Sequence, residues 1–215
     1  MYWLTRVYPF AKLGNNIYFH GERKQKRIAL TFDDGPSRET KKVLDTLRKY
    51  KARGTFFVLG RKIEGNEGTL RDIIKYGSEI GNHSYNHPSL IFKPQKLAEE
   101  QIQRTDKELK KLKIKTKLFR PPHGNFGYNL LFVADKLDKR VILWDVDPRD
   151  WSRPRIEIVT KYILSHAKNG SIIDLHDFAE GIGENSDLVK ILENVIPKLQ
   201  NRGYEFVTVS ELLNL

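Results

Sequence analysis

The sequence predicts an α/β fold of roughly six or seven strand-then-helix units, forming either a parallel sheet or a barrel of the β/α kind. Short apolar segments alternate with amphipathic helical patterns over most of the chain. Clusters of His, Asp and Asn stand just after several apolar segments, where such folds gather their functional groups. A length of 215 residues fits one domain, and neither an internal linker nor a repeat is visible.

The first half of the chain predicts three strands, each followed by a helix. Apolar, β-branched or aromatic residues predict strands at residues 28–32, 55–59 and 79–81. The helices are expected at residues 40–51, around 70–74 and at 94–113. Val43, Leu44 and Leu47 share one face of the first helix, and Pro94 suits the first turn of the third.

The second half of the chain continues the alternation. Further strands are predicted at residues 118–120, 141–143, 171–173 and 204–207. Helical patterns stand between them at residues 128–137 and 155–167. An apolar stripe from Leu188 to Leu199 then keeps helical spacing, and Gly203 ends this helix before the last strand.

The composition is that of a globular protein without thiol chemistry. Hydrophobic residues make up 39% of the chain and aromatic residues 11%, which excludes a disordered or low-complexity chain. The sequence contains no Cys, so disulfides, a thiolate nucleophile, Cys-type zinc fingers and iron–sulfur clusters are excluded. His, Asp and Glu remain as the strong metal ligands.

The chain is basic, with 38 Lys and Arg against 27 Asp and Glu and a formal net charge of +11. This charge favours an anionic partner such as nucleic acid, anionic lipid or an anionic polymer. The basic stretches at residues 23–27 and 107–117 lack interleaved aromatic residues, so they are interpreted as solvated faces and no nucleic-acid partner is expected. No apolar run approaches the roughly 20 residues that span a bilayer.

Two adjacent carboxylates, Asp33 and Asp34, follow the first predicted strand. The Asp-Gly-Pro run that continues from Asp34 is typical of a turn. Adjacent carboxylates at a strand end repel each other, however, unless a cation or an arginine stabilises both ionised forms. The pair therefore also predicts a cationic partner at this strand end.

His83 and His87 stand four residues apart after the third strand, a spacing that can bring both imidazoles to one side of a tight loop or helical turn. Polar surface loops also carry His residues, so the pair alone does not define a site. Together with Asp34 it makes two imidazoles and one carboxylate. This set is typical of catalytic zinc and also suits other divalent transition metals.

Three further polar positions are candidates for chemistry. His176 is either a hydrogen-bonded core residue or, with Asp174 and Asp177 beside it, an imidazolium that can donate a proton. Arg120, before two prolines, is either a surface cation or a guanidinium aimed at a carboxylate. Residues 147–151 are either a plain loop around a buried Trp or an acid that orients another polar group beside an aromatic wall.

Five motifs, in chain order, resemble those of the polysaccharide deacetylases, also called carbohydrate esterase family four or the NodB-homology domain. They are Thr31-Phe32-Asp33-Asp34-Gly35, His83-Ser84-Tyr85-Asn86-His87, Arg120-Pro121-Pro122-His123-Gly124, Asp147-Pro148-Arg149-Asp150-Trp151 and Leu175-His176-Asp177. The resemblance implies a distorted (β/α) barrel of about seven parallel strands in a single domain. It also implies a hydrolase that removes acetyl groups from N-acetylated sugars, such as N-acetylglucosamine units of peptidoglycan, chitin or a related glycan.

The resemblance assigns roles to the residues that match these motifs. The implied ligands of zinc, or of another divalent transition metal, are Asp34, His83 and His87. Asp33 is implied as general base and His176 as general acid. Arg120 would orient the base, and Asp150 or Asp147 would tune the acid and base from outside the substrate contacts. The residues expected at the substrate groove are His123, Trp151, Asp174 and Leu175.

The implied chemistry is consistent with what amide hydrolysis requires: an activated water, a stabilised oxyanion and a proton for nitrogen. A bound zinc ion would lower the pKa of its water to about 7 and polarise the carbonyl. Asp33 would take the water's proton, and His176 would protonate the departing amine. A backbone N–H near His123 would share the oxyanion with the metal.

Two residues depart from the family pattern. His123 stands where the family usually has Tyr, and Asp174 stands where it usually has an apolar residue of the acetyl pocket. A carboxylate disfavours a methyl group unless it pairs with a cation, so a deacylase with an altered acyl or substrate preference is one alternative. A carbohydrate-binding pseudoenzyme of the same fold is another. A nucleic-acid-binding protein and a glycoside hydrolase built on Asp33 and Asp34 are disfavoured.

Residues 1–27 are expected to form an N-terminal extension that packs on the barrel, and residues 28–215 to form the catalytic domain. We expect a monomer that acts on an N-acetylated glycan. The compartment stays open. The family favours the cell wall or the extracellular space, whereas Arg6 interrupts the opening where a signal peptide is apolar, which allows the cytoplasm.

Overall fold

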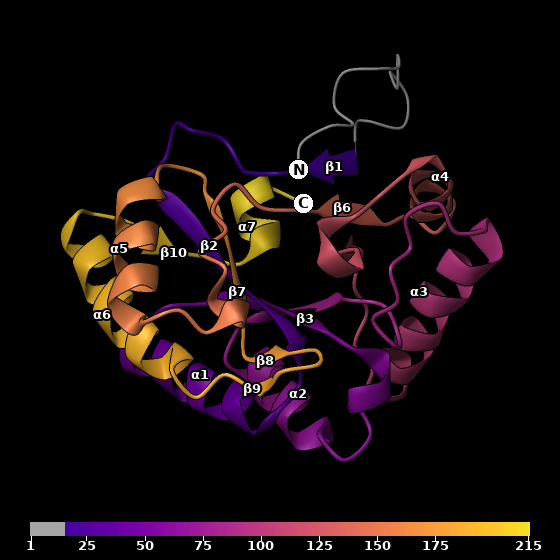
Figure 1. Cartoon of the computed structure of the whole chain (residues 1–215), viewed down its shortest axis with the longest axis horizontal. Helices are drawn as coiled ribbons and strands as arrows, with labels where there is room; N and C mark the ends of the chain where they lie inside the picture. Colours follow the sequence, from indigo (N-terminus) through magenta and orange to yellow (C-terminus); the bar gives the residue numbers. More distant parts are fainter. Residues whose placement is uncertain (1–15) are drawn as a thin grey trace.

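The structure, a computed structural model, describes residues 16–215, and its centre is an eight-stranded sheet in which the paired strands are parallel (Figure 1). The strands of this sheet are β1 (Ile17–Tyr18), β2 (Arg27–Gly35), β3 (Gly54–Val58), β4 (Glu79–Asn82), β5 (Leu118–Phe119), β6 (Arg140–Ile142), β7 (Ile172–His176) and β10 (Glu205–Phe206). Their order is β1-β6-β5-β4-β3-β2-β10, and β7 also pairs with β2.

The sheet closes on itself beyond β6. Val146, four residues after the end of that strand, forms a parallel bridge with Ile173 of β7. The Asp174 N–H donates to the carbonyl of Val146 at 2.9 Å. Because β7 pairs in turn with β2, the strands β2 to β7 form an irregular ring. The predicted α/β class and the distorted (β/α) barrel are both confirmed.

Helices follow most of the strands, and all but the last, α7, lie around the outside of the ring (Figure 1). They are α1 (Arg38–Lys49), α2 (Glu67–Lys75), α3 (Gln95–Lys111), α4 (Tyr128–Lys136), α5 (Ile156–His166), α6 (Leu188–Asn201) and α7 (Val209–Leu213). Three-residue 3₁₀ segments occur at η2 (Gly60–Lys62), η3 (Pro122–Gly124) and η4 (Asp150–Ser152). The Ser37 hydroxyl caps α1 by accepting from the Glu39 N–H, which explains why this helix begins where it does.

The apolar faces predicted from the sequence form the core. One cluster joins β2, β3 and β7 to α1, α5 and α6, and within it the rings of Phe32 and Phe56 stack 4.8 Å apart. Another cluster packs α3 and α4 against β5 and β6. Each fully buried large apolar side chain contributes about 1.5–3 kcal/mol. The core therefore fixes the strand ends that carry the polar groups.

The strands that carry the polar motifs are longer than their apolar patterns indicate. β2 continues through Asp33 and Asp34 to Gly35, and β7 continues to His176. The polar residues in these strands are buried and paired with one another, so they interrupt the apolar pattern without ending the strand. The hairpin of β8 (Phe178–Ala179) and β9 (Gly183–Glu184) was not predicted, because two-residue strands carry no pattern.

The segment before β2 contacts the barrel where the structure describes it. β1 pairs with β6 in the register Ile17 to Val141, and the Gly21 N–H donates to the carbonyl of Gly170 at 2.8 Å. Residues 1–15 of the predicted N-terminal extension lie outside the described residues, so the extension as a whole stays a prediction. Within residues 16–215, no helix is long and apolar enough to cross a membrane.

Candidate active site

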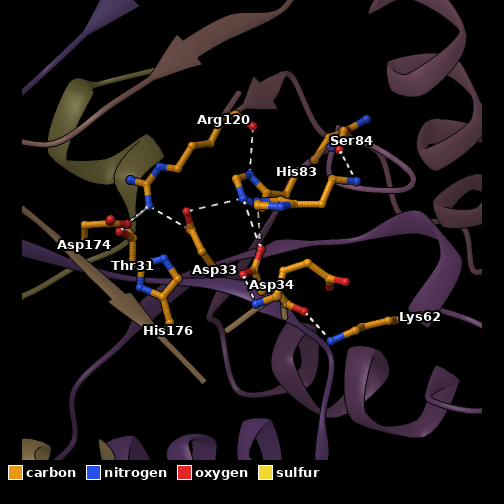
Figure 2. A network of polar contacts seen from close by, with 12 residues as sticks. Thr31, Asp33, Asp34, Lys62, His83, Ser84, Arg120, Asp174 and His176 are labelled. Carbon is orange, nitrogen blue, oxygen red and sulfur yellow. Dashed lines mark hydrogen bonds and ion pairs between the residues drawn. The ribbon is translucent and has the colours of Figure 1, made fainter. Parts of the chain in front are cut away.

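The carboxyl ends of β2, β4, β5 and β7 meet at one mouth of the barrel, and polar side chains from all four converge there (Figure 2). A β-bulge shapes the end of β2. The register with β3 shifts between Asp33 and Gly35, and Asp34 has a φ of 68°. Neighbouring residues of a regular strand point to opposite faces, but a bulge re-aims side chains. Both carboxylates consequently face His83.

Asp34, His83 and His87 form a compact group whose ligand atoms lie within 4.8 Å of one another. Oδ1 of Asp34 is 3.4 Å from Nε2 of His83 and 3.2 Å from Nε2 of His87. Burial acts to raise the pKa of Asp34, but its contact with His83 and the nearby histidine charges hold that pKa well below its usual range. Asp34 is therefore a carboxylate at neutral pH.

The donor set fits a metal ion. Nδ1 of His83 lies 2.8 Å from the carbonyl of Arg120, and a carbonyl only accepts, so a neutral His83 ring carries its proton on Nδ1 and directs the Nε2 lone pair at Asp34. Burial lowers the pKa of His87 to about 3, so this imidazole is neutral. Among the described residues, Oδ1 of Asp34 has no hydrogen-bond partner. Converging acceptor atoms with a buried, unpartnered oxygen are the arrangement that a divalent cation satisfies.

The loop that carries the two histidines is held by side chains from outside the metal group. Ser84 and His87 both have positive φ values, 72° and 61°, and the His87 N–H donates to the Ser84 hydroxyl. The N–H groups of Tyr85 and Asn86 both donate to Oε1 of Gln101, on α3. These contacts hold a conformation that the chain alone would not favour.

Arg120 lies fully buried in the centre of the barrel and holds Asp33. Its Nη1 lies 2.7 Å from Oδ1 of Asp33, 2.8 Å from Oδ1 of Asp174 and 2.7 Å from the hydroxyl of Thr31 (Figure 2). Oδ2 of Asp33 faces the metal group, 3.6 Å from Nε2 of His83. Arg120 thus fixes one oxygen of Asp33 and directs the other at the mouth.

Asp174 points at Arg120 within the barrel, and the residue is 2% exposed. Burial and the charge of Asp33 raise the pKa of Asp174 well above its usual range. The cation that the sequence required for a carboxylate at this position is therefore Arg120.

His176 is held by Asp150. Nδ1 of His176 lies 3.0 Å from Oδ1 of Asp150, while Oδ2 of Asp150 accepts from the His176 N–H and from Asn185. Burial acts to lower the pKa of His176, but the charges of Asp174 and Asp150 raise it well above its usual value, so the ring is an imidazolium. Of the two acids that the sequence left open, Asp150 contacts His176, whereas Asp147 accepts from the Arg149 N–H.

The residues predicted at the substrate groove lie in different surroundings. His123, with a φ of 60°, packs its ring edge-on against His87, 4.6 Å between centroids. Trp151 is 41% exposed, and Leu175 is fully buried in the core. The structure thus presents no exposed surface of Leu175 to a ligand, and the predicted substrate contacts of all these residues stay predictions.

The sequence did not predict that two further side chains, those of Lys62 and Asp177, lie near Asp34. Nζ of Lys62 donates to the main-chain carbonyl of Asp34 at 2.9 Å, and burial lowers the pKa of Lys62 to about 8. Asp177, fully buried, accepts from the hydroxyl of Thr40, and burial raises the pKa of Asp177 to about 7. No pattern could have revealed Lys62, because it lies on a short 3₁₀ segment between two strands.

Carboxylates, histidines and a candidate cation-binding group around one barrel mouth are the groups that a metal-assisted hydrolase uses. Comparison with known proteins supplies the family: the family model described as "Polysaccharide deacetylase" matches residues 20–142. A peptidoglycan-N-acetylglucosamine deacetylase of Bacillus cereus is 39% identical over 192 residues, which cover 88% of this chain and 89% of the relative. The chain belongs to the polysaccharide deacetylase family, which comprises hydrolases acting on amide bonds.

Solved structures agree with this assignment. The crystal structure of a peptidoglycan N-acetylglucosamine deacetylase in complex with an N-hydroxybenzamide compound has a TM-score of 0.89 and 32% identity, covering 96% of this chain and 97% of that one. A pseudoenzyme of carbohydrate esterase family four from Bacillus anthracis has a TM-score of 0.83 and 27% identity, covering 91% of this chain and 68% of that one. The fold alone therefore does not guarantee turnover.

Proposed function

We propose that this chain is a metal-dependent deacetylase that removes acetyl groups from N-acetylglucosamine units of peptidoglycan, chitin or a related glycan. The observation that carries the proposal is the convergence of Asp34, His83 and His87 beside Asp33 and His176 at one mouth. The names of the relatives support the substrate class, since the Bacillus cereus protein acts on peptidoglycan N-acetylglucosamine. A wall glycan as substrate would place the chain at the cell wall or outside the cell.

Asp34, His83 and His87 would hold the metal, which we propose to be zinc or another divalent transition metal. When bound, such an ion polarises the substrate carbonyl and makes water a stronger nucleophile at neutral pH. Asp33 has the geometry of the general base. Arg120 fixes its Oδ1, so its Oδ2 is the oxygen that accepts the water's proton.

His176 supplies the proton for the leaving nitrogen. Its side chain is 14% exposed, so the ring reaches the mouth, while Asp150 holds Nδ1 and leaves Nε2 to face the substrate. An imidazolium in this position protonates the amine as the C–N bond breaks, and acetate and a free amine result. The main-chain N–H beside His123 completes the proposed oxyanion contact.

The site supports the deacetylase more than the alternatives that the sequence left open. A pseudoenzyme of this fold exists among the relatives, but here the implied base, acid and metal residues all stand together at the mouth. An altered acyl preference caused by Asp174 finds less support, because that carboxylate is buried against Arg120. The deacetylase is therefore the function that the geometry favours.

Acetate release tests the proposal directly. Chitooligosaccharides and peptidoglycan would be incubated with the protein, with and without a chelator, and acetate measured enzymatically. We expect release that stops on chelation and returns with added Zn²⁺, and release by Asp33→Asn reduced by about 10²- to 10⁴-fold. Glycan binding without metal-dependent release would favour the pseudoenzyme instead.

A further inference from the structure

We propose that Lys62 positions the metal ligand Asp34 and thereby sets the affinity of the site for its divalent ion. The inference rests on the metal site of the proposed function. Lys62 is the last residue of η2, on the loop after β3, and its Nζ donates to the carbonyl oxygen of Asp34 at 2.9 Å (Figure 2). It therefore contacts the ligand residue through its main chain and leaves the carboxylate free to bind.

The backbone at Asp34 needs such support. Its φ of 68° lies in the left-handed region, which is unfavourable for a residue with a side chain. The bulge at this position interrupts the regular ladder between β2 and β3. The ammonium of Lys62 supplies a donor to the Asp34 carbonyl at the point where the ladder is broken.

The carboxylate of Asp34 is held from the same side. The Glu180 N–H, in the turn of the β8–β9 hairpin, donates to Oδ2 at 2.9 Å, which leaves Oδ1 directed at the two histidines. Lys62 also lies over the ring of Phe178, at the base of this hairpin. A single side chain therefore links the main chain of Asp34 to the hairpin that orients its carboxylate.

Lys62 influences metal binding in two opposite ways: its hydrogen bond positions Asp34, whereas its positive charge repels the ion. The surrounding residues favour the positioning effect. An ammonium near a divalent ion repels it, but Lys62 lies near the carboxylates of Asp177 and Glu180 as well as Asp34. These acids offset its charge locally, whereas no other side-chain donor to the Asp34 carbonyl appears within residues 16–215. Removing Lys62 should therefore weaken metal binding through lost geometry rather than strengthen it through lost repulsion.

The experiment measures Zn²⁺ affinity, by competition with a chromogenic chelator, on the full chain and its variants. Lys62→Met keeps an unbranched side chain out to Cε but lacks the Nζ donor, and we expect its dissociation constant for Zn²⁺ to rise about 10- to 100-fold. Lys62→Arg restores a donor and should regain most of the affinity. Lys26→Met is the matched control, because Nζ of Lys26 likewise donates to a main-chain carbonyl, that of Arg202 at 2.8 Å, but Lys26 stands at the amino end of β2, opposite the mouth. It should leave the affinity for Zn²⁺ unchanged.

Two results would overturn the inference: a folded Lys62→Met protein that binds Zn²⁺ as tightly as the parent or more tightly, or an equal loss of affinity in Lys26→Met. If Lys62→Met fails to fold, Lys62→Gln takes its place, since its amide is polar but one atom shorter and cannot reach the carbonyl. The same loss of affinity is expected of it. A parent chain that binds no Zn²⁺ would instead reject the metal site of the proposed function, and this inference with it.

Discussion

Replacing Asp150 with Asn tests whether Asp150 keeps His176, the proposed general acid, protonated. Oδ2 of Asp150 accepts from both the His176 N–H and Asn185, and Oδ1 faces Nδ1 of His176 at 3.0 Å. An amide at this position would keep its oxygen toward the two donors and turn its NH₂ toward Nδ1. A donor facing Nδ1 disfavours a proton there, so the substitution removes a negative charge and also favours the wrong tautomer.

The size of the effect follows from the distance. The charges of Asp174 and Asp150 raise the pKa of His176 against the opposing effect of burial. An opposite charge at this range shifts a pKa by about 1–3 units. Asp150→Asn should lower the pKa of His176 by that amount, and the alkaline limb of kcat/KM, where the acid form is lost, should move to lower pH equally. At a pH above the alkaline limb of the parent, the rate should fall roughly 10- to 1,000-fold, since each unit is tenfold.

The assay is acetate release over a range of pH, with metal content measured in parallel. Asp147→Asn is the control, because Asp147 is a neighbouring acid that contacts the Arg149 N–H instead of His176. It should leave the alkaline limb in place. An unshifted limb in Asp150→Asn, with metal bound and the fold intact, would refute the assignment of Asp150 and His176 as an acid pair.

Four further outcomes follow from the same geometry. His176→Ala should lower turnover about 10²- to 10⁴-fold with the metal still bound, as acetate release and metal analysis would show; unaltered turnover would remove His176 from the role of acid. Arg120→Met leaves Asp33 and Asp174 buried without their cation, which costs about 3–5 kcal/mol and lowers the Tm by about 6–20 °C in calorimetry; an unchanged Tm contradicts this. Adding free Zn²⁺ at 100 times its dissociation constant should stabilise the metal-free protein by about 2.7 kcal/mol, as calorimetry would measure. Equal stability with and without Zn²⁺ would argue against a bound metal. Asp174→Asn should leave the ratio of acetyl to propionyl release unchanged, while a changed ratio would place Asp174 at the acyl group.

The sequence was most informative where periodicity or spacing carried the signal. The helical stripe that ends at Leu199 and the β-branched strand at residues 55–59 appear close to their predicted places. The three implied metal ligands do come together, since strand ends of a parallel barrel share one mouth. Spacing could not decide between Asp147 and Asp150, because both lie in one irregular loop and only the chain path brings Asp150 to His176.

Contacts between distant segments could not be predicted. Lys62 meets Asp34 through a main-chain carbonyl, and such a contact imposes no residue pattern that a single sequence displays. The bulge at Asp34 was likewise hidden, since Asp-Gly-Pro is typical of an ordinary turn. Gln101 supports the histidine loop from the middle of a helix whose sequence shows only amphipathic spacing.

The strand register explains the depth at which Asp174 lies in the barrel. Residues two apart in a strand share a face, so Asp174 and His176 both point into the barrel. The register between β2 and β7 sets Asp33 opposite His176 and Thr31 opposite Asp174. The first pair lies at the mouth, and the second lies one layer deeper, where barrel interiors are filled by side chains. Here that filling is the guanidinium of Arg120, which contacts Thr31, Asp33 and Asp174 together. A carboxylate in this deeper layer pairs with the cation that orients the base, so its presence is compatible with an acetyl group bound above it.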